Sequence, residues 1–229
     1  MQIDFVTLFP EICSGALDFS ITGRAQRTGQ LKCRFVNLRD FAHDARRTVD
    51  DVPYGGGAGM VLMPEPLFEC LEAINPGPEK GHVVLMCPQG KRFVQQDAVR
   101  LSSYSHLIFV CGHYEGVDER VRQMLADEEL SIGDYVLTNG AIAAAVVADA
   151  VIRLLPGVLG CDGSSDEESF SDTALLEYPQ YTHPEEFRGM CVPQVLLSGD
   201  HGRIEEWRKE QRAIRSIARR PDIFEGQEQ

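Results

Sequence analysis

Short runs of apolar residues alternate with helix-like segments through the first two thirds of the chain. The runs at 3–8, 31–36, 82–86 and 107–111 are short and rich in Val, Ile and Leu, which is typical of strands that are buried on both faces of a sheet. Helices are predicted over 11–19, 66–74, 117–125 and 140–154. This alternation predicts an α/β fold with a mainly parallel sheet.

The pattern changes after Pro156 and Gly157. Residues 161–168 read Cys-Asp-Gly-Ser-Ser-Asp-Glu-Glu, a polar and acidic stretch that is typical of a linker or loop. Beyond it, one amphipathic helix is predicted over 202–218. The sequence therefore predicts an α/β domain over 1–160, a flexible interdomain linker over 161–172, and a small, mostly helical domain over 173–229.

Charge is spread unevenly along the chain. Its 229 residues include 22 Lys and Arg against 35 Asp and Glu, a formal net charge of −13. An even spread of that charge would argue against nucleic-acid or membrane partners, because both need a positive field. However, the segments 22–50 and 203–220 each contain seven basic and three acidic residues. Either segment alone is explained by a solvated helix face, but two such segments favour local contacts with phosphates.

Cysteine usage and hydropathy indicate the compartment. The seven cysteines are widely spaced and form no CxxC pair, which indicates reduced thiols. Residues 1–9 are apolar but lack a basic leader, and the apolar run 141–151 is interrupted by Asp149 and falls short of the ~20 residues of a membrane span. We therefore expect a cytoplasmic protein with no membrane partner.

Three loops that contain glycine lie next to predicted strands or helices. Two of them, 87–90 (Cys-Pro-Gln-Gly) and 111–116 (Cys-Gly-His-Tyr-Glu-Gly), directly follow predicted strands, and the third, 131–140, which ends in Thr-Asn-Gly, precedes a predicted helix. Open α/β sheets bind ligands at the carboxyl ends of their strands, where backbone amides can hold an adenine-like ring or a carboxylate. A further glycine-rich loop, 53–60, matches neither the P-loop nor the dinucleotide fingerprint, and both a tight turn and a ligand loop are consistent with it.

Signatures of nucleophilic and metal chemistry are weak. The sequence contains no Gly-x-Ser-x-Gly elbow, and its six histidines show neither HExxH nor His-x-His spacing, so no metal-binding residue is assigned. The acidic cluster 166–168 is either a solvated loop or the source of a general base, because crowded carboxylates raise one another's pKa.

Long blocks of the sequence closely resemble the bacterial tRNA (guanine-N1-)-methyltransferase family, TrmD, of the SPOUT superfamily. They run in order along nearly the whole chain and include Leu-Phe-Pro-Glu at 8–11, Thr-Val-Asp-Asp at 48–51, Pro-Tyr-Gly-Gly-Gly at 53–57, Tyr-Glu-Gly-Val-Asp-Glu-Arg at 114–120, Ser-Ile-Gly-Asp-Tyr-Val-Leu at 131–137 and Pro-Gly-Val-Leu-Gly at 156–160. The resemblance implies a SPOUT-type α/β fold with a mainly parallel sheet and a C-terminal deep trefoil knot, plus a small, mostly helical C-terminal domain. It also implies a homodimer whose active site is shared between subunits.

The implied reaction moves the methyl group of S-adenosylmethionine to N1 of the guanosine immediately 3′ of the tRNA anticodon, at position 37, which maintains the reading frame. The residues that match the family's cofactor contacts are Met86, Cys87, Pro88, Gly112, Tyr114, Glu115, Gly116, Ile132, Gly133, Tyr135, Val136, Leu137 and Gly140. Those expected to contact the tRNA anticodon stem-loop are Arg24, Arg46, Asp50, Tyr54, Gly59, Ser198, His201, Arg208, Arg215 and Arg219.

The resemblance also implies the catalytic groups. Arg153 matches the arginine that the family is proposed to place at O6 of guanine. Glu168, ahead of Ser-Phe at 169–170, stands where the family has its catalytic aspartate, and its longer side chain requires the base to approach from about 1 Å further back. Asp166 is the fallback base. Glu115 is expected either to orient Arg153 or to help to bind Mg²⁺, which the family is described as needing.

Smaller departures from the family pattern lie in the cofactor loops. Asn139 and Ala141 replace residues that are usually Gly and Glu, and Cys87 stands where Ser is common. Two alternatives remain at this point. One is another SPOUT methyltransferase that acts on ribose or a different base, which the block 39–59 and the C-terminal domain argue against. The other is an inactive RNA-binding homologue, which only the change from Asp to Glu favours.

Overall fold

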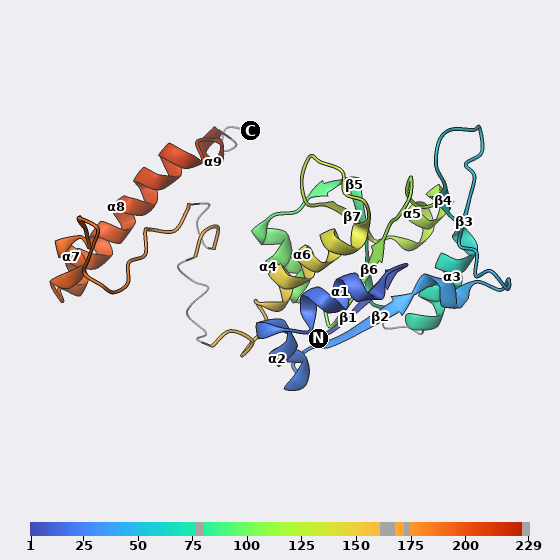
Figure 1. Cartoon of the computed structure of the whole chain (residues 1–229), viewed down its shortest axis with the longest axis horizontal. Coiled ribbons are helices and arrows are strands. Elements are labelled where there is room, and N and C mark those ends of the chain that lie inside the picture. The colour runs from blue at the N-terminus through green and yellow to red at the C-terminus, as the bar shows by residue number, and fades with distance from the viewer. Residues whose placement is uncertain (77–79, 161–167, 172–174, 226–229) are drawn as a thin grey trace. The chain divides into compact units, whose positions relative to one another are not determined.

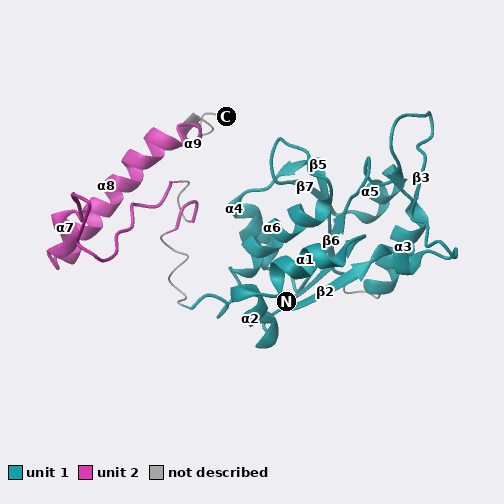
Figure 2. Cartoon of the chain, viewed as in Figure 1, with its two compact units in different colours: residues 1–160 teal, residues 161–229 magenta. Residues whose placement is uncertain are grey.

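The chain forms two compact units, Met1–Gly160 and Cys161–Gln229, coloured teal and magenta in Figure 2. The computed structural model describes residues 1–76, 80–160, 168–171 and 175–225. Most of the linker predicted over 161–172 therefore lies outside the described residues.

Unit 1 is built on a five-stranded sheet with the strand order β2-β1-β6-β5-β7. The strands are β1 (Gln2–Thr7), β2 (Lys32–Asn37), β5 (His82–Arg92), β6 (His106–Cys111) and β7 (Glu128–Ser131). Every neighbouring pair is parallel, which confirms the predicted parallel α/β sheet. A short hairpin of β3 (Asp50–Asp51) and β4 (Val61–Leu62) stands beside it.

Helices cover both faces of this sheet (Figure 1). On one face lie α1 (Pro10–Leu17), α2 (Ser20–Arg27), α4 (Gln95–Ser102) and α6 (Gly140–Ile152). On the other lie the 3-10 turn η1 (Leu38–Phe41), α3 (Pro64–Ile74) and α5 (Glu119–Leu125). Successive strand residues such as Phe109 and Val110 enter opposite cores. Burial on both sides explains why the strands are continuously apolar.

Six described elements of unit 1 were not predicted: the short hairpin strands β3 and β4, the turn η1, the edge strand β7, and the helices α2 and α4. β7 contains Glu-Glu-Leu-Ser and so has a single large apolar residue, and the charged pair survives in this edge strand because the acids form ion pairs. α2 and α4 are short and mainly polar, and α2 also contains Gly23. β5 is longer than the predicted run at 82–86, because pairing with β7 resumes after an irregularity.

Glu128 ties β7 to α4 through an ion network. Its carboxylate accepts a hydrogen bond of 2.7 Å from Arg100 Nη2 and lies 2.7 Å from His82 Nε2. Burial alone would raise the pKa of Glu128, but the hydrogen bonds from Arg100 and His82 outweigh it and leave the pKa below its ordinary value. The ionised carboxylate therefore stabilises this edge of the fold.

Unit 2 is organised around α8 (His201–Arg219), with α7 (Gln194–Leu197), α9 (Asp222–Glu225) and the hairpin of β8 (Glu186–Phe187) and β9 (Met190–Cys191). The Leu176 N–H donates to the buried Ser216 Oγ at 2.8 Å, and the Arg208 guanidinium stacks 4.6 Å from the centre of the Tyr178 ring. These contacts hold an extended segment against α8. In the part of the chain that the structure describes, no helix combines the length and the apolar character needed to cross a bilayer.

Candidate cofactor pocket

A pocket with a volume of about 280 Å³ opens at the carboxyl ends of β5 and β6 and continues to β7. Its walls are the loop that interrupts β5, the loop after β6 and the loop between β7 and α6. All residues predicted to contact the cofactor line it: Met86, Cys87, Pro88, Gly112, Tyr114, Glu115, Gly116, Ile132, Gly133, Tyr135, Val136, Leu137 and Gly140. The three loops singled out from the sequence thus meet around one cavity.

The second and third loops are held against one another by their backbones. The Gly140 N–H donates to the Gly112 carbonyl at 2.8 Å, and His113 forms an isolated bridge with Asn139. A Cβ atom added at Gly140 would lie 2.9 Å from the Gly112 nitrogen and 3.0 Å from the Cys111 Cα. Glycine at 140 is therefore what allows α6 to begin directly on the end of β6.

The first loop is a bulge within β5. Met86 and Lys91 both pair with Leu130 of β7, so the residues between them are displaced from the ladder and form a wall of the pocket. A Cβ atom added at Gly90 would lie 2.5 Å from the Glu129 carbonyl carbon. The end of the bulge therefore packs directly on the backbone of β7.

The glycine-rich loop 53–60 also reaches this region. The Glu115 N–H donates to the Met60 carbonyl at 2.9 Å, and the Leu62 N–H donates to the Gly116 carbonyl at 3.0 Å. A Cβ atom added at Gly59, whose φ is +82°, would lie 2.5 Å from Glu115 Cγ. Gly59, predicted to contact tRNA, therefore lies against Glu115, which was predicted to be catalytic. In the same hairpin Asp50 is half-buried and Tyr54 is fully exposed.

Two predicted catalytic residues are not among the pocket lining. Arg153 follows the last residue of α6, whereas Gly140 at the start of that helix lines the pocket. At about 1.5 Å per residue, Arg153 lies about 20 Å along the helix from Gly140. Glu168 belongs to unit 2, where its carbonyl accepts a hydrogen bond of 2.9 Å from Ser171 Oγ. Asp166 lies outside the described residues.

The residues predicted to contact tRNA come from both units. In unit 1, Arg46 is exposed, while Arg24 donates from Nη2 to the Val158 carbonyl at 2.8 Å. In unit 2, Ser198 and His201 lie at the junction of α7 and α8, and the remaining three lie along α8: Arg208, Arg215 and Arg219. The two sets belong to separate units.

Part of the positive charge in segment 22–50 is used within the fold. Arg34 forms an ion pair with the fully buried Asp4, and Arg47 lies 3.1 Å from Asp40. Counting residues along the sequence therefore overstates the charge that this segment can offer to phosphates. Sequence alone could not show this, because Asp4 lies on a different strand.

Some pocket residues were missed by sequence reasoning. His113 and Asn139 lie within loops that were already singled out, so their position could have identified them. The His113 ring packs between Phe9 and Tyr114, with ring centres 5.3 and 4.5 Å away. Arg122 also lines the pocket, but it belongs to α5, and no local pattern in the sequence marks it.

The donor set does not fit a resident metal ion. Glu115 is the acidic residue among the described residues of the pocket lining. Across the described ranges, no group of three or more His, Cys, Asp or Glu side chains gathers that could hold a metal ion. No step of the chemistry below is therefore routed through Mg²⁺.

The lining does fit a nucleoside-type cofactor. Met86, Ile132, Val136 and Leu137 supply apolar surface, and the glycine-bearing loops offer backbone polar groups at the strand ends. The absence of a Cβ at Gly140 lets two of these loops pack backbone against backbone at the edge of the pocket. The fold and the pocket together define an α/β protein with a candidate ligand pocket at the carboxyl ends of parallel strands.

Comparison with known proteins identifies the family. The family model for tRNA (guanine-1)-methyltransferase TrmD matches residues 1–226. The tRNA (guanine-N(1)-)-methyltransferase of Geobacillus kaustophilus is 52% identical over 225 residues, which cover 98% of this chain and 92% of the relative. The enzyme of the same name from Staphylococcus aureus strain MRSA252 is 53% identical, with 98% and 91% covered. The chain belongs to the TrmD family of SPOUT proteins, and the trefoil knot stays a prediction for it.

Proposed function

We propose that this protein is an S-adenosylmethionine-dependent methyltransferase that modifies N1 of the guanosine at position 37 of tRNA. The observation that supports this most strongly is the pocket. Every residue that matches a family cofactor contact lines one cavity at the carboxyl ends of three parallel strands, although the residues are spread from Met86 to Gly140.

The chemistry needs a base and a group that stabilises negative charge. S-adenosylmethionine supplies an electrophilic methyl group on a sulfonium centre. N1 of neutral guanine carries a proton, so a carboxylate near N1 must accept that proton as the nucleophile attacks. We assign this role to Glu168. Charge that develops on O6 is stabilised by a positioned cation, and we assign that role to Arg153.

The position of Arg153 supports a homodimer with a shared active site. Within one chain, α6 carries Arg153 about 20 Å from Gly140, so the residue does not reach its own pocket along the helix. Arg153 would therefore act at the pocket of a second copy. Its proposed interaction with Glu115 is likewise one between subunits.

An exposed apolar stripe on α6 supports the same assembly. Ile142 and Val146 are one helical turn apart and are 45% and 49% exposed, although most of α6 is buried. A second copy is the occupant proposed for this face, because α6 links the pocket to Arg153. Replacement of Val146 by Glu should shift the protein from dimer to monomer in light scattering, and an unchanged dimer would overturn the proposed interface.

We assign the tRNA contacts to residues of both units. α8 carries Arg215 and Arg219, together with further basic residues that give its segment a positive balance. Gly59 lies beside Glu115 at the pocket and Tyr54 is fully exposed in the same loop, a placement that suits contact with an extruded base. The substrate and the free thiols of the described cysteines both suit a cytoplasmic enzyme.

Methyl incorporation into two tRNA transcripts tests the proposal. The protein is incubated with radiolabelled S-adenosylmethionine and a transcript that has either G or A after the anticodon. Label should enter the G transcript alone. Label in both transcripts would indicate a different target, and cofactor binding without label in either would indicate an inactive RNA-binding homologue.

A further inference from the structure

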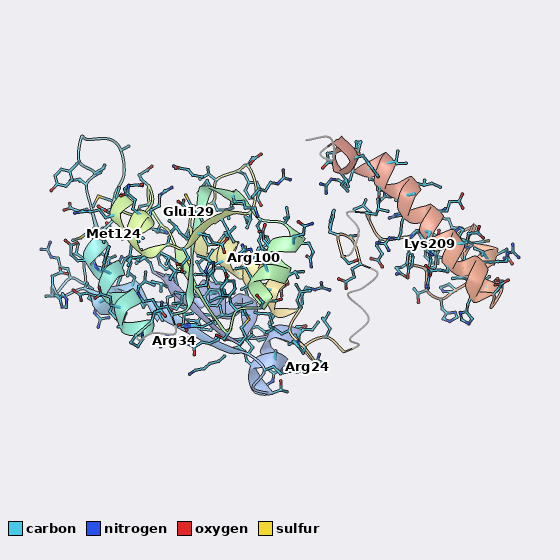
Figure 3. The ribbon with its side chains drawn as sticks, turned by 180° about the vertical axis from the view of Figure 1, so that it is seen from behind. Arg24, Arg34, Arg100, Met124, Glu129 and Lys209 are labelled. Carbon is cyan, nitrogen blue, oxygen red and sulfur yellow. The ribbon has the colours of Figure 1, made fainter. Side chains whose placement is uncertain are left out.

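Arg122 connects the pocket's first loop to the rest of the fold. From α5, its Nη1 donates to Glu129 Oε2 on β7 at 2.8 Å and to Gln89 Oε1 in the bulge at 3.3 Å. Its Nη2 lies 3.6 Å from Cys87 Sγ, and its side chain is only 21% exposed. One guanidinium thus contacts a helix, an edge strand and a cofactor loop. Figure 3 labels its partner Glu129, which in that view lies between Met124 of α5 and Arg100 of α4.

In the part of the chain that the structure describes, the bulge is fixed at Gly90, by a hydrogen bond from the Gln89 N–H to Cys87 Sγ, and by Arg122. Its four residues are displaced from the strand ladder, which resumes only at Lys91. Gly90 fixes one end by packing on the backbone of β7. The middle of the bulge is held through the side chains of Cys87 and Gln89, and both of these contact Arg122. The fork geometry of guanidinium, with several donors in one plane, is what allows these contacts at once.

Arg122 is paired with two carboxylates. Glu129 Oε2 lies 2.8 Å from Nη1, and Glu119 Oε2 lies 3.1 Å from Nε. A guanidinium between two carboxylates is more than compensated in charge, so Arg122 presents no unpaired positive charge to the pocket. Its effect on a ligand therefore comes from holding the loop and not from its charge.

We propose that Arg122 is a positioning residue that fixes the 87–90 bulge and thereby sets the affinity of the pocket for S-adenosylmethionine. This inference rests on the proposed function, because it takes the pocket to be the cofactor site. The cofactor contacts expected from Cys87 and Pro88 depend on the conformation of this bulge. Arg122 itself takes no part in methyl transfer.

The test compares Arg122→Met with Arg100→Met in the full-length protein. Arg100 provides a matched control because its ion pair of 2.7 Å also ends on β7, at Glu128, but it does not line the pocket. Calorimetry should show that Arg122→Met raises the cofactor Kd about tenfold, the equivalent of one lost charge-assisted hydrogen bond. Arg100→Met should leave Kd unchanged.

Further measurements distinguish a role of Arg122 in positioning the bulge from a role in overall stability or a direct effect of its charge. At saturating cofactor, kcat of Arg122→Met should stay within about twofold of wild type, because the loss is in ground-state binding. The Kd for S-adenosylhomocysteine, which lacks the sulfonium charge, should rise by at least the same factor as that for S-adenosylmethionine, because the carboxylates that Arg122→Met leaves unpaired attract only the cationic ligand. Arg122→Lys keeps the cation but loses the fork, so its Kd should lie between those of wild type and Arg122→Met.

The outcomes distinguish this inference from the proposed function. Wild-type protein that binds no S-adenosylmethionine would overturn the assignment of the pocket itself. Wild-type binding with equal Kd for Arg122→Met and Arg100→Met, or a change confined to the cationic ligand, would overturn the positioning role alone. If Arg122→Met does not fold, Gln89→Leu removes one contact on the loop side and should raise Kd about threefold. An unchanged Kd in that variant contradicts the inference equally.

Discussion

Replacing Gly140 by Ala tests how closely the second and third loops must approach. The added Cβ would lie 2.9 Å from the Gly112 nitrogen, and 3.0 and 3.2 Å from the Cys111 Cα and carbonyl carbon. All three atoms belong to the backbone, so the strain cannot be relieved by rotation of a side chain. The start of α6 must move away from the end of β6, which lengthens the 2.8 Å hydrogen bond to Gly112.

The expected change in the free energy of unfolding of Gly140→Ala is the sum of two opposed effects. Overpacking against a rigid surface costs about 1–3 kcal/mol. Alanine gains up to about 1 kcal/mol in helix propensity over glycine, and less at the first helical residue. We expect Gly140→Ala to lower the free energy of unfolding by about 2 kcal/mol, and to raise the S-adenosylmethionine Kd about tenfold because the loop at Gly112 moves.

Gly15 provides the matched control. It lies inside α1, and a Cβ added there would meet nothing within 4 Å. Gly15→Ala should therefore raise the free energy of unfolding by about 0.5–1 kcal/mol and leave cofactor affinity unchanged. Urea denaturation and calorimetry measure both quantities. Equal stability and equal Kd for the two variants would refute the reasoning that Gly140 is required by close backbone packing.

Three further predictions concern chemistry, substrate and pH. Glu168→Gln should lower the rate of methyl transfer in single-turnover methylation by about 100-fold or more while leaving the cofactor Kd unchanged. A full rate in Glu168→Gln, together with loss of methyl transfer in Asp166→Asn, would assign the role of base to Asp166. Exchange of Arg215 and Arg219 for Glu should weaken tRNA binding in filter assays and reduce its salt slope by about 1 for each phosphate that the variant no longer binds, whereas an unchanged tRNA Kd would make them ordinary surface arginines. The pKa of Glu128 lies below its usual 4.5 in the folded protein, so its contribution to stability is present above that pH and is lost as pH falls through the folded value. Urea titrations should therefore show that the stability difference between wild type and Glu128→Gln shrinks below pH 4.5, and a constant difference would contradict this.

The strongly apolar parts of the fold could be predicted from the sequence. The runs that became β1, β5 and β6 are buried on both faces, so their composition alone marks them as strands. β7 is different, because its Glu128 and Glu129 are held by arginines from other elements. No local pattern can predict a strand that depends on partners so distant in sequence.

The residues of the candidate site likewise fall into those that local sequence patterns predict and those that depend on contacts between distant elements. Loops next to apolar strands were identified locally, and they meet around one pocket because parallel strands end at one edge of a sheet. Arg122 was missed because its role depends on contacts to the bulge and to β7. The sequence predicted the length of α6, and this length separates Arg153 from Gly140. Only the structure shows that Gly140 lines the pocket, and this placement is what makes a contribution of Arg153 from a second subunit the proposal.

Net charge gave the wrong indication about the partner, and its distribution gave a better one. The value of −13 argued against nucleic acid, whereas two basic segments favoured it. The structure refines this view further, since Arg34 and Arg47 are paired with acids within unit 1. In unit 2, Lys209 and Arg220 are likewise paired with Glu205 and Asp222, so both basic segments offer less charge to phosphates than their residue counts indicate.

The identity and position of the methylated nucleoside test the central claim most directly. Wild-type protein is incubated with S-adenosylmethionine and a tRNA that has G after the anticodon, and the product is digested and mapped by mass spectrometry. We predict 1-methylguanosine at position 37 and at no other site. A ribose-methylated nucleoside, or 1-methylguanosine elsewhere in the tRNA, would contradict the account.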